Sequence, residues 1–131
     1  MIFTKPLWGG ILYTAAKRVV VKKEDHQRAL ESMMELNSIG EKLSLIEGVN
    51  AMTDVTGFGL LGHLIEVCEG SGLSAEIEYS KIPLMENLQH YTSQFIYPDN
   101  TMRNWSSYQH KVEGISGESL LTLSDPQTNG G

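Results

Sequence analysis

One short segment of the chain places a carboxylate, two hydroxyls and three glycines between an apolar run and an amphipathic stretch. It reads Thr-Asp-Val-Thr-Gly-Phe-Gly-Leu-Leu-Gly-His and spans residues 53–63. At such a junction, free backbone N–H groups at the start of a helix bind phosphate oxygens. The Asp54 carboxylate would then hold a Mg²⁺ ion that the phosphates share. The residue types therefore predict a site for phosphate and its metal ion.

Each polar residue of this segment also has an ordinary structural interpretation. Asp54 is either a metal ligand or a helix N-cap, which contributes about 1 kcal/mol. Thr53 and Thr56 either donate to phosphate or cap the same helix. Gly57 and Gly59 permit a close approach of the backbone, either to phosphate or to a neighbouring strand. No Gly-Lys-Ser/Thr follows, so the segment is not a Walker loop.

A few residues outside the motif are further candidates. Lys5 either reaches a phosphate as a point charge or is a solvated lysine at a strand end. Arg103 with Asn104 either holds an anion or braces the long loop predicted around them. Asp125 either starts a turn or lies at the edge of the site. None of the histidines has zinc-ligand spacing, and a packed or surface role is the ordinary one for His63. The histidines are His26, His63, His90 and His110.

Hydrophobic periodicity predicts the elements that position these residues. Short strands are predicted over 1–7, 49–55, 73–79 and 120–123, and residues 11–21 are compatible with helix or strand. Helices are predicted from Glu24 or Asp25 to about residue 45, from Asp54 or Thr56 to the glycines at 70 and 72, and over 85–95. Residues 97–111 are predicted to form a long loop. Strands alternating with helices predict an α+β fold with α/β-like layering, in which helices cover a mixed β-sheet.

Two of the predicted helices carry apolar residues at helical spacing. In the first, a broad stripe predicts packing against a sheet, with the methionines at 33 and 34, and the later Met52, as core residues. In the second, a narrow face predicts a buried and unreactive Cys68. The stripe comprises Ala29, Leu30, Met33, Met34, Leu36, Ile39 and Leu43, and the narrow face comprises Leu61, Leu64, Ile65 and Cys68.

Length and composition limit the class of protein. With 131 residues, 40% hydrophobic and 20% charged, the chain is predicted to be one soluble globular domain. A net charge of -6 argues against a nucleic-acid-binding face. No apolar run approaches the roughly 20 residues that span a membrane, and Lys5 and Pro6 interrupt any signal peptide. The single cysteine excludes an internal disulfide and favours a cytoplasmic location.

Three motifs follow one another along the chain. They are Thr-Lys-Pro-Leu at 4–7, the central motif at 53–63, and Asp-Pro-Gln-Thr-Asn-Gly-Gly at 125–131. With Arg103-Asn104 and Ser107-Tyr108, they resemble the C-terminal domain of selenophosphate synthetase (selenide, water dikinase). That family belongs to the aminoimidazole ribonucleotide synthetase-like superfamily of ATP-using enzymes. The resemblance spans nearly the whole chain.

The resemblance implies conversion of ATP, water and selenide to selenophosphate, AMP and phosphate, with Mg²⁺. Asp54 would complete a metal site whose other carboxylates come from an N-terminal domain. That domain would also carry the catalytic cysteine or selenocysteine and a lysine, and would form a homodimer. No catalytic residue is therefore expected within residues 1–131, which are expected to be a single C-terminal-type domain, truncated at its C-terminus. The expected nucleotide-binding residues are Lys5, Thr53, Thr56 and Gly57.

The chain departs from the family pattern at three places. Trp8-Gly9 stands where Gly-Thr is usual, Asn129 where Ser is usual, and Asp99-Asn100-Thr101 where Gly-Gly-Thr is usual. Two other functions stay open on the sequence. One is another enzyme of the superfamily, acting on a purine or thiamine precursor, and the other is a non-catalytic binding module. If the resemblance to selenophosphate synthetase holds, activity is expected of the full-length enzyme and not of this chain alone.

Overall fold

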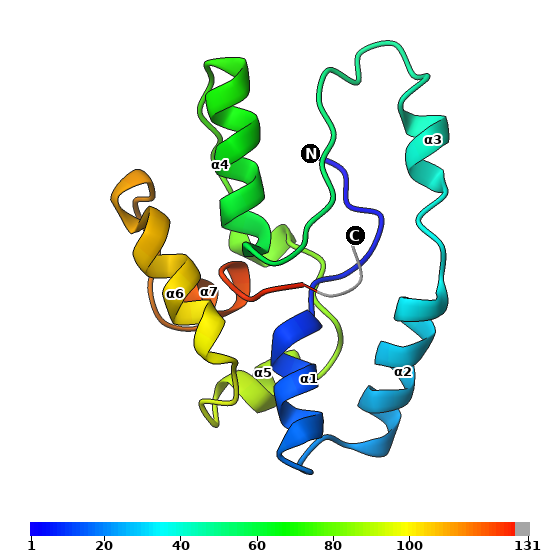
Figure 1. The fold of residues 1–131 in the computed structure, drawn as a ribbon, viewed down its shortest axis with the longest axis vertical. Coiled ribbons are helices and arrows are strands. Elements are labelled where there is room, and N and C mark those ends of the chain that lie inside the picture. Colours follow the sequence, from blue (N-terminus) through cyan, green and yellow to red (C-terminus); the bar gives the residue numbers. More distant parts are fainter. Residues whose placement is uncertain (128–131) are drawn as a thin grey trace.

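A computed structural model describes residues 1–127, and this part of the chain is helical (Figure 1). The α-helices are α1 (Gly9–Lys17), α2 (Lys23–Met34), α3 (Ile39–Leu43), α4 (Gly59–Ser71), α5 (Leu88–Thr92), α6 (Asp99–Tyr108) and α7 (Gly117–Leu123). Two short 3₁₀ helices are η1 (Tyr79–Lys81) and η2 (Gln109–Lys111). Within the described residues, no helix is long and apolar enough to cross a membrane.

The predicted mixed β-sheet is wrong. Over residues 1–127 the strand pairing is one isolated parallel bridge between Leu7 and Leu84. Its hydrogen bonds run from the Leu7 N–H to the Pro83 carbonyl (2.8 Å) and from the Met85 N–H to the Leu7 carbonyl (3.1 Å). An alternating sequence defines two faces of an extended segment, but a strand also needs a neighbour that pairs with its backbone. The predicted strands lack such neighbours here.

Several element boundaries also differ from the prediction. Residues 49–55 and 73–78 form neither helix nor strand, and residues 120–123 lie in α7. The predicted loop over 97–111 is instead α6 followed by η2. The helix predicted to run to residue 45 is divided into α2 and α3. The predictions of α4 and of a helix within 85–95 are confirmed, and residues 11–21 are largely helical.

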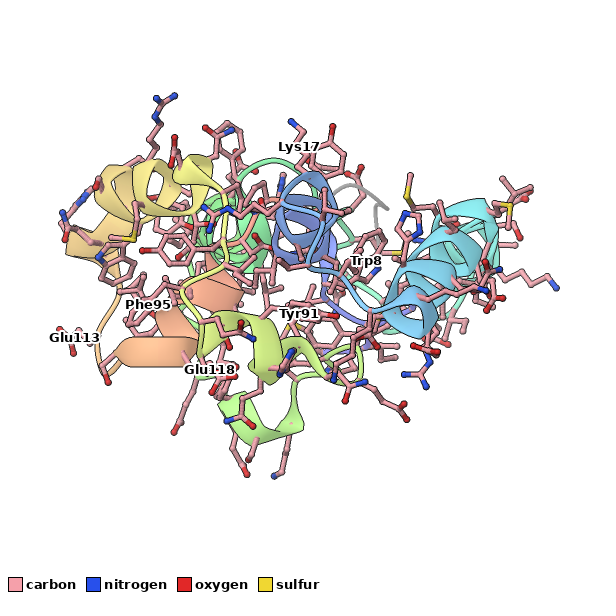
Figure 2. The ribbon with its side chains drawn as sticks, turned by 90° about the horizontal axis from the view of Figure 1, so that it is seen from below. Trp8, Lys17, Tyr91, Phe95, Glu113 and Glu118 are labelled. Carbon is pink, nitrogen blue, oxygen red and sulfur yellow. The ribbon has the colours of Figure 1, made fainter. Side chains whose placement is uncertain are left out.

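Two hydrophobic clusters hold the helices together. The first lies where α1 packs against α2 and α5, and Figure 2 shows Trp8 and Tyr91 directed toward that space. It comprises Trp8, Ile11, Leu12, Ala15, Ala29, Met85, Leu88, Tyr91 and Ile96. The second lies among α4, α6 and α7 and comprises Leu7, Val55, Leu60, Leu61, Ile82, Tyr108 and Leu123. Leu7 and Val55 thus anchor the segments before α1 and α4 in the second cluster.

The predicted apolar stripe of α2 is mostly exposed. Ala29 is buried, but Met33 and Leu36 are 51% and 84% exposed, and Met34 and Met52 are exposed as well. Met33, Met34 and Met52 are therefore not core residues. One reason is that α2 meets its neighbour α1 through a narrow face rather than lying on a sheet. Cys68 is likewise only half-buried.

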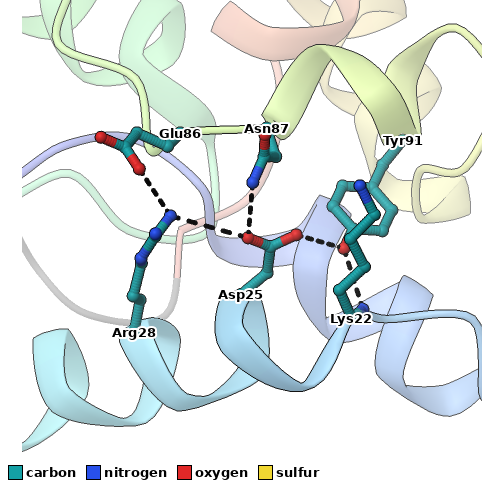
Figure 3. Close-up of polar contacts among 6 residues, drawn as sticks. All are labelled: Lys22, Asp25, Arg28, Glu86, Asn87 and Tyr91. Atoms are coloured by element: carbon teal, nitrogen blue, oxygen red, sulfur yellow. Dashed lines mark hydrogen bonds and ion pairs between the residues drawn. The ribbon is translucent and has the colours of Figure 1, made fainter.

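A buried carboxylate joins α2 to α5 (Figure 3). Asp25 accepts hydrogen bonds from the Tyr91 hydroxyl (2.6 Å) and from Asn87 Nδ2 (3.0 Å), and Tyr91 also accepts from the Lys22 N–H (3.0 Å). Burial raises the pKa of Asp25, but these hydrogen bonds and the charges of Lys22 and Arg28 outweigh it and hold the pKa below its ordinary value. Burial and the bond to Asp25 raise the pKa of Tyr91.

Candidate functional site

Residues 125–127 of the closing motif join the central motif to the start of α1, which directly follows the opening motif at 4–7. Figure 1 shows the segment before α1, the loop before α4 and the segment after α7 coming together near the centre of the molecule. Residues 125–127 form the link, because they contact both the first turn of α1 and the central motif. Motifs that are far apart in sequence therefore form one hydrogen-bonded unit.

Residues 125–127 satisfy the four backbone N–H groups that the first turn of α1 leaves unpaired. Gln127 Oε1 accepts from the N–H groups of Trp8 (3.0 Å) and Gly9 (2.9 Å). The Pro126 carbonyl accepts from the Gly10 N–H (2.7 Å). Asp125 Oδ2 accepts from the Ile11 N–H (3.1 Å). The first turn is thus capped by side chains and backbone from the other end of the described chain: the donors are Trp8, Gly9, Gly10 and Ile11.

Asp125 is completely buried in this unit. Burial raises its pKa well above the ordinary carboxyl value, even though hydrogen bonds from Ile11, Gly10, Thr101 and Gln127 oppose that shift. The positive end of the α1 dipole also favours a carboxylate here. The sequence suggested a turn or the edge of the site for Asp125, and its bond to the first turn of α1 is a role that neither interpretation included.

The closing motif and α6 hold the central loop in place. The Thr56 carbonyl accepts from the N–H groups of Gln127 (2.9 Å) and Gly59 (3.1 Å). Asn104 Nδ2 donates to the Gly57 carbonyl (2.8 Å) and to the carbonyl of residue 124 (3.0 Å). The Tyr108 hydroxyl donates to the Phe58 carbonyl (3.1 Å). The predicted bracing of a long loop by Arg103 and Asn104 is wrong, because both residues lie in α6: Asn104 braces the loop before α4, and Arg103 is exposed.

Asp54 is exposed, and so are its neighbour Thr53 and the loop residue Gly57, whereas Val55 between them is buried. The buried valine anchors the loop and leaves the Asp54 carboxylate free to meet solvent or a ligand. Neither Asp54 nor Thr56 caps α4, whose N-cap is Phe58 without a side-chain capping bond. The predicted capping role of these residues is therefore wrong. The Thr53 hydroxyl donates only to the Asp54 carbonyl (3.2 Å).

Gly57 and Gly59 differ sharply in their surroundings. A Cβ at Gly59 would lie 2.8 Å from the Ser124 carbonyl carbon, and Gly59 has a φ of +71°. Gly59 therefore allows α4 to approach the segment after α7. At Gly57, no described atom lies within 4 Å of an added Cβ. The backbone at Gly57 therefore has no close contact with another described residue on its Cβ side, and a group outside residues 1–127 has room to approach it there.

The Lys5 ammonium lies at the carboxyl end of α2. Lys5 is buried, and its Nζ donates to the carbonyls of Ser32 (3.0 Å) and Glu35 (2.6 Å). A cation at this position complements the helix dipole. The prediction of a solvated lysine is therefore wrong. To bind phosphate, Lys5 would have to exchange these carbonyls for phosphate oxygens.

His63 is a neighbour of Thr56 that the sequence analysis gave no chemical role. It is buried, and its Nε2 lies 3.0 Å from the Thr56 hydroxyl oxygen. Gln127, which caps α1 and fixes Thr56, was also overlooked. Two features of the sequence could have pointed to these residues. His63 lies one turn into the predicted helix, and Gln127 directly follows Asp125-Pro126.

The described residues bring together no group of three or more His, Cys, Asp or Glu side chains that would hold a metal ion. A groove of about 820 Å³ lies elsewhere, between α4 and the segments 73–79 and 110–115. None of the predicted site residues lines it.

Residues 2–127 match the family described as "AIR synthase related protein, C-terminal domain". The chain belongs to this family. Curated relatives named "Selenide, water dikinase" are similar to it over all 131 residues: 50% identical in Haemophilus influenzae, 45% in Pseudomonas putida and 46% in Aeromonas hydrophila. The chain spans 38% of the length of each of these relatives. The predicted family resemblance is confirmed.

Proposed function

We propose that this chain is the C-terminal part of an ATP-dependent phosphotransferase that makes selenophosphate from selenide, ATP and water. The observation that carries the proposal is the 45–50% identity to curated selenide, water dikinases along the entire chain. The chain spans 38% of the length of those relatives, and on this proposal the catalytic groups lie in the rest of the enzyme. On this proposal, an N-terminal domain provides them and forms the homodimer, and the enzyme acts in the cytoplasm.

Within that enzyme, Asp54 is the metal ligand of this domain. Its exposure on a loop anchored by Val55, Asn104 and Gln127 supports the role, because the carboxylate is held at a fixed place and stays accessible. Mg²⁺ takes about six oxygen ligands. One carboxylate therefore fits as a partial site, and phosphate oxygens, waters and carboxylates of the N-terminal domain would complete it. The bound ion would neutralise charge on the phosphates during transfer.

The nucleotide meets the same loop. The open space at Gly57 supports a close approach of phosphate to the backbone there. Thr53 and Thr56 flank Asp54 and are placed to contact the complex of metal and nucleotide. Lys5 joins them only after leaving the carbonyls at the end of α2. On this proposal, the loop 53–58 forms one wall of the nucleotide-binding cleft.

The test is Asp54→Asn in the full-length protein, with Glu47→Gln as a control that removes an exposed carboxylate outside the motif. We expect D54N to abolish most Mg²⁺-dependent, selenide-dependent ATP turnover, because an amide binds Mg²⁺ much more weakly than a carboxylate does. E47Q should retain normal turnover. Normal turnover of D54N over a full Mg²⁺ titration would show that Asp54 is not a ligand.

A further inference from the structure

Two side chains of α6 hold successive carbonyl groups of the loop before α4. Asn104 Nδ2 donates to the Gly57 carbonyl (2.8 Å), and the Tyr108 hydroxyl donates to the Phe58 carbonyl (3.1 Å). Asn104 and Tyr108 are both buried and lie about one helical turn apart, so they share one face of α6. This face therefore determines the direction of two consecutive peptide groups in the loop.

The hydrogen bonds of Asn104 fix the orientation of its side-chain amide. Nδ2 also donates to the Ser124 carbonyl (3.0 Å), so both hydrogens of the amide point at carbonyl oxygens. A flipped amide would place its own oxygen against the same two carbonyls, which is repulsive. A carboxylate at this position would have the same defect, because it has no hydrogen to donate.

The held carbonyls also set the direction of the N–H groups in the loop. No peptide bond in residues 1–127 is cis, and in a planar trans peptide the N–H points opposite to the C=O. Because the Gly57 carbonyl is directed toward α6, the Phe58 N–H points away from α6. The Thr56 carbonyl is held by the N–H of Gln127 (2.9 Å), which likewise turns the Gly57 N–H away from residue 127.

These two N–H groups belong to the exposed part of the loop. Gly57 is exposed, Phe58 is 56% exposed, and no described atom lies within 4 Å of a Cβ added at Gly57. Among residues 1–127, neither N–H group has a hydrogen-bond acceptor. The Gly59 N–H, by contrast, donates to the Thr56 carbonyl. The loop thus presents two donors whose directions are fixed by α6 and by residue 127.

We propose that Asn104 and Tyr108 are positioning residues that keep the N–H groups of this loop directed at the nucleotide. The inference rests on the proposed function, in which the loop 53–58 forms one wall of the nucleotide-binding cleft. An ionised phosphate oxygen accepts hydrogen bonds, so it is bound best by donors that are already oriented toward it. Asn104 acts on the Phe58 N–H through the Gly57 carbonyl. Tyr108 fixes the next peptide group, and with it the conformation of Phe58.

The first experiment measures the KM for ATP in selenide-dependent turnover by the full-length protein. Tyr108→Phe removes one hydrogen bond and keeps the ring, so it should raise this KM about fivefold. The kcat should change little, because donors that hold the nucleotide equally in the ground and transition states affect KM alone. Asn104→Asp removes both donors of the amide and should raise the KM by more than about tenfold.

Tyr79→Phe is the matched control for Y108F. The Tyr79 hydroxyl donates over the same 3.1 Å, but to Thr122 Oγ1 instead of to the loop, and Tyr79 packs against the same second cluster. Both variants should unfold at a lower urea concentration than the wild type, whereas only Y108F should raise the KM for ATP. An unchanged KM in Y108F would overturn the proposal, and this comparison decides even if N104D does not fold.

Hydrogen exchange of the Phe58 N–H gives a readout besides activity. In full-length protein labelled with ¹⁵N-phenylalanine, the signal that is absent from Phe58→Leu identifies this group. We expect fast exchange in the free protein, slower exchange with saturating ATP, and weaker protection by ATP in Y108F. Protection without selenide-dependent turnover would refute the proposed function and leave the positioning role standing. Turnover in which ATP does not protect the Phe58 N–H would refute the positioning role alone.

Discussion

The two glycines at the start of α4 provide the most direct test of the fold around the site. Gly59→Ala places a methyl group in a left-handed backbone conformation, which costs about 1–2 kcal/mol. The same methyl group would lie 2.8 Å from the Ser124 carbonyl carbon and 2.9 Å from the Leu123 carbonyl oxygen. Both are backbone atoms that no change of rotamer can move away, so overpacking adds about 1–3 kcal/mol.

The expected loss for G59A is therefore about 2–5 kcal/mol, out of a total of about 5–15 kcal/mol for a typical domain. Gly57→Ala is the matched control, because its added Cβ contacts no described atom. Replacing a glycine in a compatible conformation changes stability by less than about 1 kcal/mol, usually upward. Urea unfolding followed by far-ultraviolet circular dichroism measures both values. Equal unfolding midpoints for G59A and G57A would refute the packing of α4 against the segment after α7.

Two further predictions concern buried polar groups. Gln127→Ala leaves the buried N–H groups of Trp8 and Gly9 without an acceptor, so urea unfolding should show a loss of about 2–4 kcal/mol; an equally large loss in the exposed control Gln94→Ala would contradict this. Because the pKa of Asp25 is lowered by folding, the stability that wild type has over Asp25→Asn should be fully present above about pH 4, the ordinary carboxyl value, and should disappear as the pH falls through the lowered pKa. A difference that stays constant from neutral pH down to acid would show that the Asp25 carboxylate is not stabilised by its partners.

The local signals in the sequence were sufficient for the central helix. Leu61, Leu64 and Ile65 recur at helical spacing, and Gly72 ends α4 in the left-handed conformation that glycine favours. The exposed placement of Asp54 also follows from the local pattern, because it precedes the apolar Val55 of an extended segment. These features depend on neighbours within a few residues, which a single sequence contains.

The absence of a sheet from residues 1–127 could not be predicted from local sequence, because strand pairing depends on segments that are distant in the chain. Residues 73–79 alternate as a strand does, yet the structure places no paired strand beside them within residues 1–127.

The prediction failed at α6 for a different reason. Its buried positions are Thr101, Asn104 and Tyr108. They have helical spacing but are polar or amphipathic, so hydrophobic periodicity does not reveal them. Proline and aspartate, as at Pro98 and Asp99, occur in loops but also mark the start of a helix.

The capping of α1 links residues 125–127 to the loop before α4, although the two are far apart in the sequence. Gln127 accepts from the first turn of α1 through its side chain and donates to the Thr56 carbonyl through its backbone. The position of the Asp54 loop is therefore coupled to α1, and through α1 to the first hydrophobic cluster. A carboxylate that meets an ion from outside the domain needs a fixed position but an exposed surface. The structure meets both needs, because it buries Val55 and holds the Thr56 carbonyl by hydrogen bonds while leaving Asp54 exposed.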